Sequence, residues 1–497
     1  MDQLDRRSFL AKAAASGLTL AAGAEFAAPA AGAIKAACKP GPPIPGSIER
    51  AIRGHVFTRS TPGFTGASHV FNTLFDGVRP KWVARPVNTA DVRAAVRWAI
   101  KHDVPVRARS GGHSYAGYST LKDGLVLDLR RLDGVSFNRS TGIATIGAGA
   151  QLLNVYRTLA NAGATIPAGS CPSVGIGGHA LGGGMGLAGR AFGLTLDNLV
   201  EATIVTADGC VRTVSNRTER DLFWALRGAG GGNFGVVTQL KLRTHRLPSV
   251  VSWFFMSWPW SQAANALAAW QAWNGRAPTQ VSSVFHLETG PQVALAGQYM
   301  GPSGNVPGLL SSLRSVPGAS LSYGQQSYFA MQMRWAGCSQ LSFNACHTVG
   351  AWPGGTMQRD TFRAASDYVN KPLSAAGRAA AVRAIENRQG QPGSGALLFD
   401  SYGGVINRVH PNATAFVHRN ALACIQYLTY NGGYAWLGQT KAAMRPFVSG
   451  FAYQNYIDPA QRNWQQAYYG SNYKRLLAVR REIDPDHVFN FPQAIGR

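Results

Sequence analysis

The chain is poor in acidic residues, and its basic residues are never concentrated in one run. Among 497 residues, 48 lysines and arginines stand against 24 aspartates and glutamates, a formal net charge of +24. No block of five consecutive basic residues, zinc-finger spacing or basic zipper is present, which argues against nucleic acid as a partner. A solvated basic surface is the simpler interpretation, and attraction to an anionic polymer or cell envelope is the alternative.

Cysteine is also scarce, with six residues and no Cys-x-x-Cys pair. Histidine and cysteine do not cluster at metal-ligand spacing, so we expect no metal site. The nearest cysteines in sequence, Cys338 and Cys346, are candidates for a disulfide that clasps a loop. The spacing leaves the pairing of Cys38, Cys210 and Cys424 open.

A long apolar run is missing from the N-terminus. Arg6 and Arg7 precede Ser-Phe-Leu, a short alanine-rich stretch and small-residue cleavage sites. The stretch is too short and too weakly apolar to span a membrane. Residues 1–33 therefore predict an export signal that resembles the twin-arginine type, which carries folded proteins. Residues 34–49 are rich in proline and predict an extended lead-in.

With 45% hydrophobic residues, the rest of the chain is long enough for two or more domains. Residues 50–247 mix short β-like runs with amphipathic helices. One such helix is expected over 89–103, with Thr89 as its cap and Val92, Val96, Ala99 and Ile100 on its buried face. The pattern predicts an α+β module.

The region from 248 to 440 differs in texture, because eight of the twelve tryptophans lie there. Its strand-like runs VVSWFFMSW, VALAGQYM, ALLFDSYGG and ACIQYLTY predict a second sheet. The stretch SQAANALAAWQAWN predicts a helix that covers this sheet. Residues 441–497 return to polar, tyrosine-rich sequence.

Glycine is abundant, with 58 residues, and three dense clusters stand out: RSGGHSYAG, GSCPSVGIGGHALGGGMG and RGAGGGNFG. Such loops bring backbone N–H groups close to a ligand and suit phosphate or pyrophosphate. Three of them indicate one large, extended ligand. GIGGHA with Asp197 also matches a dinucleotide fingerprint, but Pro167 and Pro172 interrupt the strand that this fingerprint requires.

Two of these loops carry a nucleophile, His113 in the first and Cys171 in the second. An imidazole and a thiol on phosphate-binding loops fit metal ligands, a nucleophile pair, or attachment points for an electrophilic cofactor. Two ligands are few for a metal, and no motif supplies an oxyanion hole for a hydrolase. Attachment of a cofactor such as a flavin is the interpretation that the residues favour.

RSGGHSYAGYS, GSCPSVGIGGHALGGGMGLAGRAFGLTLDNL, DLFWALRGAGGGNFGVVT and a terminal DPDHVFNFPQAI occur in this order. Together they resemble the berberine bridge enzyme-like FAD-linked oxidases of the vanillyl-alcohol oxidase and p-cresol methylhydroxylase superfamily. The resemblance implies a two-part FAD-binding domain over 50–247 and a substrate domain with a helix-covered antiparallel sheet over 248–440. The segment 441–497 would return to the FAD domain. It further implies a bicovalent FAD, bonded to His113 through the 8α-methyl carbon and to Cys171 through C6.

The same resemblance implies a set of further cofactor contacts on the glycine loops and their flanks. These are Arg109, Ser110, Gly111, Gly112, Ser114, Gly117, Gly169, Ser170, Val174, Gly175, Gly177, Gly178, Gly182, Gly235, Val236 and Asn490.

For catalysis, FAYQNYIDPA is similar to the family's Tyr-x-Asn-Tyr segment, which implies Tyr453 as base or polar anchor over the flavin. Its phenol would need a hydrogen-bonding or cationic neighbour to act as a base near neutral pH. Asp400, Gln426 and Tyr115 are further candidates for the substrate pocket.

Two residues depart from the family pattern. Met185 stands where a second tyrosine is frequent, and Cys424 stands where plant relatives often have lysine. Both departures argue against a two-tyrosine or lysine-assisted base, and the substrate is therefore not carried over from the resemblance.

Val174 occupies a position that the family associates with admitting oxygen, which implies an oxidase that produces hydrogen peroxide. The expected substrate is a small hydroxyl compound, preferably a saccharide. A tailoring oxidase or dehydrogenase of secondary metabolism is the alternative within the family. A non-catalytic basic protein that binds envelope polymers is the alternative from another class.

Overall fold

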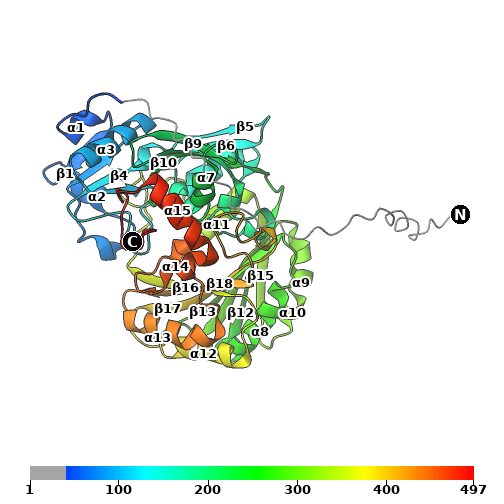
Figure 1. The fold of residues 1–497 in the computed structure, drawn as a ribbon. Coiled ribbons are helices and arrows are strands. Elements are labelled where there is room, and N and C mark those ends of the chain that lie inside the picture. Colours follow the sequence, from blue (N-terminus) through cyan, green and yellow to red (C-terminus); the bar gives the residue numbers. More distant parts are fainter. Residues whose placement is uncertain (1–40) are drawn as a thin grey trace, which may run out of the picture. The chain divides into compact units, whose positions relative to one another are not determined.

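A computed structural model describes residues 41–497 of the chain (Figure 1). The expected export signal, most of the lead-in and Cys38 lie outside these residues. Within them, no helix combines the length and apolar character needed to cross a membrane. The described chain is a mixed α+β structure, as the sequence predicted.

Two larger sheets and the short antiparallel pair of β7 (Ala164–Thr165) and β11 (His245–Arg246) make up the N-terminal half. The first is four-stranded in the order β1-β2-β4-β3, and the second is five-stranded and antiparallel in the order β5-β6-β10-β8-β9. The strands of the first are β1 (His55–Thr58), β2 (Trp82–Arg85), β3 (Val106–Arg109) and β4 (Leu125–Asp128). Those of the second are β5 (Val135–Asn138), β6 (Ile143–Gly147), β8 (Leu199–Val205), β9 (Val211–Ser215) and β10 (Val236–Arg243).

Helix α3 (Thr89–Lys101) packs between these sheets and corrects two details of the sequence prediction. Its N-cap is Asn88, whose side chain accepts from the Asp91 N–H at 2.8 Å, whereas Thr89 donates to Thr238. Val92, Val96 and Ala99 are buried as expected, but Ile100 is 41% exposed. Ile100 lies about 80° around the axis from Val92, at the solvent edge of the buried stripe.

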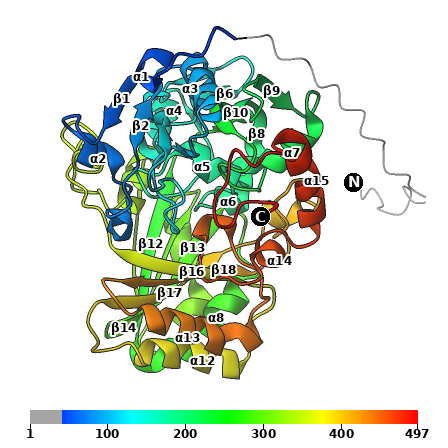
Figure 2. The same ribbon diagram turned by 60° about the vertical axis from the view of Figure 1, so that its left-hand side comes forward.

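The second half contains a seven-stranded antiparallel sheet in the order β15-β12-β14-β13-β17-β18-β16. All four strand-like runs expected from the sequence belong to it. Helices α8 (Ala263–Asn274), α12 (Ala375–Glu386) and α13 (Tyr434–Met444) cover one of its faces (Figure 2). The strands are β12 (Val251–Pro259), β13 (Val281–Glu288), β14 (Gln292–Tyr299), β15 (Ser320–Gln326), β16 (Phe362–Val369), β17 (Ser394–Ser401) and β18 (Ala423–Tyr430).

The alternation of side chains along β12 explains how this sheet divides its two faces. Phe254, Met256 and Trp258 are buried in the core shared with the covering helices. Trp253 and Phe255 alternate with them and lie on the opposite face, where Phe255 is 36% exposed. The uncovered face is therefore free to line a cleft.

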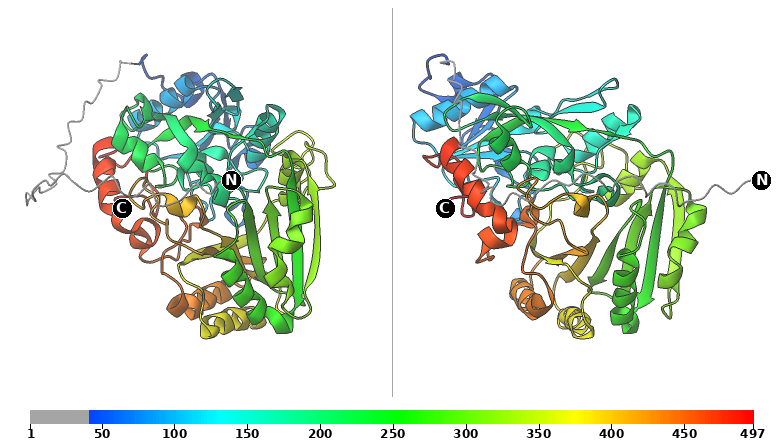
Figure 3. Two further views of the ribbon diagram at one scale, coloured as in Figure 1. Left: turned by 90° about the vertical axis from the view of Figure 1, so that its right-hand side faces the viewer. Right: turned by 45° about the vertical axis from the view of Figure 1, so that its right-hand side comes forward.

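The C-terminal segment packs against the N-terminal half through α14 (Trp464–Tyr469) and α15 (Tyr473–Ile483), drawn in red in Figure 3. Helix α15 contacts α7 (Arg220–Leu226). The Ile495 N–H donates to Asn233 Oδ1 at 2.9 Å, and the Tyr469 hydroxyl donates to the Ala229 carbonyl at 2.8 Å. These contacts join the end of the chain to the third glycine loop.

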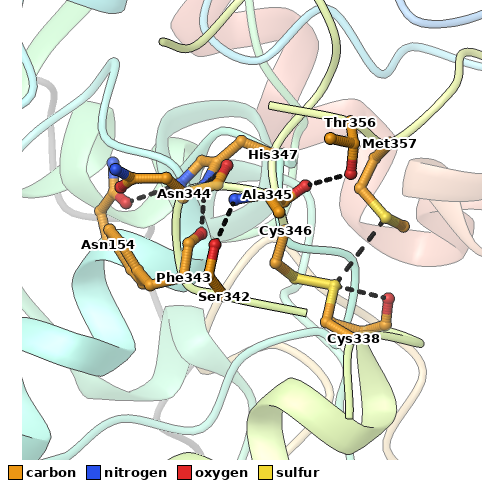
Figure 4. The surroundings of a disulfide bond; sticks show 11 residues. Asn154, Cys338, Ser342, Phe343, Asn344, Ala345, Cys346, His347, Thr356 and Met357 are labelled. Atoms are coloured by element: carbon orange, nitrogen blue, oxygen red, sulfur yellow. Dashed lines mark hydrogen bonds between the residues drawn. A yellow bond between two sulfur atoms is a disulfide. The ribbon is translucent and has the colours of Figure 1, made fainter. Parts of the chain in front are cut away.

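Cys338 and Cys346 form the expected disulfide, with a Cα–Cα distance of 5.7 Å (Figure 4). The disulfide closes a loop that follows α11 (Tyr328–Trp335). His347 directly follows this loop, and its Nε2 lies 2.9 Å from Oδ1 of Asn154 in α4 (Leu152–Asn161). The backbone N–H groups of the first turn of α4 donate to carbonyls of the second glycine loop. The disulfide thus fixes the end of α11 beside the glycine loops.

Candidate functional site

A cavity of about 720 Å³ is lined by the glycine loops, the uncovered face of the seven-stranded sheet and the segment 453–457. It unites residues far apart in the sequence, as the predicted site requires. The predicted residues that line it are Ser110, Gly111, Gly112, His113, Ser114, Tyr115, Gly169, Ser170, Cys171, Val174, Gly175, Gly177, Gly178, Gly235, Asp400, Gln426 and Tyr453.

The two candidate attachment residues lie in this same cavity. His113 stacks on Phe71 at 4.1 Å, and its Nε2 lies 2.9 Å from Ser173 Oγ. Burial lowers the pKa of His113 to about 3, so its ring is neutral and keeps a lone pair. Nδ1 has no hydrogen-bond partner among residues 41–497, and the thiol of Cys171 is exposed and free. Both groups are available to an electrophile in the cavity.

Close backbone contact between the first two glycine loops explains part of their composition. A Cβ at Gly111 would collide with Gly175, and one at Gly175 would collide with Ser110. At Gly178 a Cβ would meet no atom within 4 Å and would instead project into the cavity. A Cβ at Gly231 would contact only the Gly178 backbone. This open, backbone-lined cradle fits the pyrophosphate of FAD.

The rival dinucleotide fingerprint is not supported. Its glycines open α5 (Ile176–Leu181) directly from a loop rather than from a strand. Asp197, its acidic residue, binds Arg419 at 2.7 Å and the Leu194 N–H at 2.9 Å. Its carboxylate is therefore engaged in a structural ion pair.

The hydroxyl of Tyr453 is held by three donors. The N–H groups of Gly184 and Met185 donate to it at 3.0 and 3.1 Å, and the Asn455 amide donates at 3.1 Å. Burial nevertheless raises the pKa of Tyr453 to about 12, against the effect of these hydrogen bonds. The side chain is protonated near neutral pH and has its own proton to donate. Met185 thus contributes its backbone N–H to the binding of the Tyr453 hydroxyl. The side chain of Cys424 is buried.

Asp400 meets Tyr456 on the same cavity wall. The Tyr456 hydroxyl donates to Asp400 Oδ2 at 3.4 Å. Burial raises the pKa of Asp400 to about 7, and Asp400 is the one carboxylate among the described residues that line the cavity. A carboxylate with this pKa is suited to exchange protons near neutral pH.

Tyr115 and Gln426 complete this cluster. The Gln426 amide donates to the Tyr115 hydroxyl at 2.9 Å, and the Tyr115 ring stacks on Tyr456 with centroids 5.4 Å apart. The first glycine loop, the sheet and the C-terminal segment thereby meet at one point.

Five predicted residues do not line the cavity. For the side chain of Arg109 the structure corrects the prediction: the guanidinium is buried, binds Asp128 at 3.2 Å and donates to backbone carbonyls. An ion pair inside the first sheet therefore holds this side chain away from the cofactor loops. The other four are Gly117, packed against Phe75; Gly182, packed against Asn455; Val236, buried in β10; and Asn490, exposed between two cavity-lining phenylalanines.

Sequence reasoning missed two residues of the site. Tyr456, which binds Asp400, is the second tyrosine of the quoted Tyr-x-Asn-Tyr segment, so its signal was present. His179 lies within the second glycine loop and accepts from the Gly169 N–H at 2.9 Å. Burial lowers the pKa of His179 to about 4, which keeps it a neutral acceptor that fixes the loop bearing Cys171.

Comparisons with known proteins identify the family to which the chain belongs. Residues 80–215 match the FAD binding domain family, and residues 452–496 match the berberine and berberine-like family. The Bacillus subtilis FAD-linked oxidoreductase YgaK is 32% identical over 457 residues, covering 89% of this chain and 97% of that protein. Xylooligosaccharide oxidase of Thermothelomyces thermophilus is 30% identical over 444 residues, covering 84% of this chain and 87% of its own.

Among solved structures, BBE-like 1 of Physcomitrella patens superposes with a TM-score of 0.84 at 32% identity. The match covers 90% of this chain and 98% of that one. The similarity therefore extends over most of both chains. The chain therefore belongs to the berberine bridge enzyme-like family of FAD-linked oxidoreductases.

Proposed function

We propose that this protein is an exported oxidase that oxidises a hydroxyl group of a saccharide and reduces molecular oxygen to hydrogen peroxide. The observation that carries the proposal is the meeting of Asp400 and Tyr456 in the cavity that also contains His113 and Cys171. A group suited to accept protons near neutral pH thus faces the same space as the two proposed attachment points for FAD.

The proposed attachment is bicovalent, through His113 and Cys171. Its support is the neutral ring of His113, the unpartnered Nδ1 within the described chain and the exposed thiol of Cys171. The loop glycines, Gly178 and Gly231 among them, would hold the pyrophosphate. When bound, FAD would supply the acceptor for hydride from the substrate carbon and, once reduced, the donor of the two electrons that convert oxygen to hydrogen peroxide.

Asp400 and Tyr456 would remove the proton of the substrate hydroxyl. Burial keeps the pKa of Tyr456 far above 10, so Tyr456 alone is a poor base. Its hydroxyl already points its proton at Asp400, however. As the Tyr456 oxygen takes the substrate proton, its own proton passes to Asp400 Oδ2, and no phenolate needs to persist.

Tyr453 would act as a polar anchor rather than as the base. The Tyr453 oxygen accepts three hydrogen bonds, so its hydroxyl proton is left to donate to a further acceptor. A neutral phenol held in this way is suited to donate to a substrate oxygen and orient it.

The polar and aromatic side chains that line the cavity near Asp400 favour a saccharide as substrate. Tyr115, Gln426 and Asp400 provide polar contacts beside an aromatic face, an arrangement suited to hydroxyl-rich rings. The relative named xylooligosaccharide oxidase adds support. Oxygen as acceptor rests on Val174, whose short side chain lines the cavity beside Cys171. Export rests on the sequence of residues 1–33.

A panel of substrates tests the proposal, with hydrogen peroxide release as the measurement. Neutral oligosaccharides, aromatic alcohols and alkaloid-type amines would be offered to the flavin-loaded protein. Peroxide from oligosaccharides alone would support the proposal. Turnover of only the aromatic or alkaloid compounds would instead identify a tailoring oxidase, and a colourless protein that loads no flavin would contradict the enzyme altogether.

A further inference from the structure

A straight row of four side chains crosses the uncovered face of the seven-stranded sheet. Phe255 of β12 pairs with Ala296 of β14, Ala296 pairs with Val284 of β13, and Val284 pairs with Asp400 of β17. Directly paired residues point to the same face, and all four line the cavity. We name this set the floor row.

The floor row is longer than the space that one sugar needs. It crosses three strand spacings, and at about 4.8 Å per spacing Asp400 and Phe255 are roughly 14 Å apart. The two residues between them, Val284 and Ala296, have small side chains that leave a trough above the sheet. A trough of this length suits a trisaccharide whose reacting unit lies at Asp400.

Aromatic rings stand at the far end of the row. Phe255 lies 5.8 Å from Trp335 of α11, between ring centroids. The Trp335 indole donates to Gln298 Oε1 at 2.8 Å, while the Gln298 amide donates to the Leu187 carbonyl at 3.1 Å. Gln298 is fully buried, and both ends of its amide are used to fix this wall. The rings offer a rigid apolar face on which a sugar ring can stack.

Arg334 lies next to this wall and is half-buried. Buried arginines elsewhere in the fold have acceptors: Arg109 and Arg419 bind carboxylates, and Arg190 and Arg388 donate to backbone carbonyls. Arg334 lines the cavity, yet among residues 41–497 its guanidinium has no carboxylate and no hydrogen-bond acceptor, and its buried Nε is unpaired.

The guanidinium of Arg334 is nevertheless held in place. It lies over the ring of Trp253 at 4.3 Å. The disulfide between Cys338 and Cys346 fixes the chain just after α11 (Figure 4). A fixed, partly desolvated guanidinium without a partner favours a bidentate anion, and a carboxylate matches its planar fork.

We propose that the far end of the cleft is a subsite for an acidic sugar, in which Arg334 binds the carboxylate of a uronic acid while Phe255 and Trp335 support its ring. The uronic acid would be the unit farthest from the sugar at Asp400. Asp400 is the one carboxylate among the described residues that line the cavity, and it lies at the opposite end of the floor row. It is therefore too distant to repel the carboxylate of the uronic acid strongly. The orientation of the oligosaccharide, with its reacting unit at Asp400, rests on the proposed function. The subsite itself rests on Arg334 and its surroundings.

The test compares two matched trisaccharides with the flavin-loaded protein. One is xylotriose, and the other is xylobiose carrying glucuronic acid on its non-reducing unit. Both are reduced to alditols, so that calorimetry measures binding without turnover. The acidic compound is expected to bind at least about tenfold more tightly, because a charge-assisted hydrogen bond is gained. This advantage should shrink as salt rises.

Arg334→Gln should abolish the advantage, so that the acidic and the neutral compound bind with similar affinity. Arg334→Lys, which keeps the charge but lacks the fork, should retain part of it. Arg314→Gln removes an exposed arginine of α10 (Ser311–Arg314), outside the cavity lining, and should change nothing. If Arg334→Gln unfolds, Arg334→Lys decides the matter, because an acidic advantage unchanged in that variant would contradict recognition by the planar fork.

Peroxide release from the unreduced sugars separates the two proposals. Oxidation of both sugars with equal affinity for their alditols would overturn the acidic subsite and leave the oxidase standing. Arg334-dependent binding of the acidic alditol without oxidation of either sugar would overturn the oxidase of saccharides and leave the subsite standing.

Discussion

The Tyr456 hydroxyl donates to Asp400 Oδ2 at 3.4 Å and so joins the C-terminal segment to strand β17. The proposed function gives proton removal to this pair of residues rather than to Tyr453, the tyrosine that the sequence motif pointed to. It also makes the pH dependence of the reaction predictable.

Asp400→Asn should lower kcat by about 10²-fold or more, the usual contribution of a positioned base. In the native protein, the pKa of about 7 means that Asp400 is protonated below neutrality and cannot accept a proton. We expect kcat to rise with pH up to about 7 and then level off, measured by oxygen consumption. Loss of this profile in Asp400→Asn, with flavin content unchanged, confirms the role; an unchanged profile contradicts it.

Tyr453→Phe should cost less than Asp400→Asn. It leaves the N–H groups of Gly184 and Met185 without their acceptor, at about 1–3 kcal/mol of folding stability for a buried donor. We expect a loss of about tenfold in kcat/KM through poorer orientation, with the pH profile of the native enzyme preserved. If this variant instead loses the pH-dependent step, Tyr453 is the base and Asp400 is not.

His113→Ala and Cys171→Ala should each keep FAD attached through the remaining bond, and the double variant should release it. Flavin fluorescence on a denaturing gel, together with the mass of the intact chain, measures attachment. Cys424→Ala is the matched control, because Cys424 is a free but buried cysteine. Release of flavin from either single variant would contradict a two-point attachment.

Val174→Leu should slow the reaction with oxygen while substrate oxidation continues. The longer side chain would fill space in the cavity wall beside Cys171. We expect oxygen consumption to fall by roughly tenfold, equivalent to about 1.4 kcal/mol in barrier height. An artificial electron acceptor should restore turnover, and equal losses with both acceptors would argue for a packing role alone.

Asp128→Asn should destabilise the fold without involving the cleft. Burial opposes ionisation of Asp128, but Arg109, Arg130 and Arg85 outweigh it and lower its pKa to about 2. Removing the charge leaves these cations unpaired, at a cost of about 3–5 kcal/mol in the free energy of unfolding, measured with denaturant. Asp123→Asn, which breaks the exposed pair with Arg59, should cost less than about 1 kcal/mol.

The ion pairs of Asp128 also predict that the fold loses stability at acidic pH. Because the folded pKa of Asp128 lies below its ordinary value of 3.8, the ion pair contributes fully above that pH. The contribution is lost as pH falls towards about 2. Wild-type and Asp128→Asn proteins should therefore differ most in stability above pH 4, and a constant difference down to pH 2 would contradict this account.

The sequence by itself determined the chemistry that the loops carry. Glycine clusters, His113 and Cys171 are local features, because close backbone approach and nucleophilicity depend on residue type at a position. The strand-like runs of residues 248–440 likewise predicted the sheet of the second half, because β-branched and aromatic residues favour strands.

Only the tertiary structure decided which residues meet. Arg109 reads as part of a cofactor loop, yet its ion pair with Asp128 of a neighbouring strand turns it inward. Tyr456 meets Asp400, 56 residues away in the chain, and the floor row depends on the register of four strands. Such contacts arise from strand order and packing between distant segments, which no local pattern encodes.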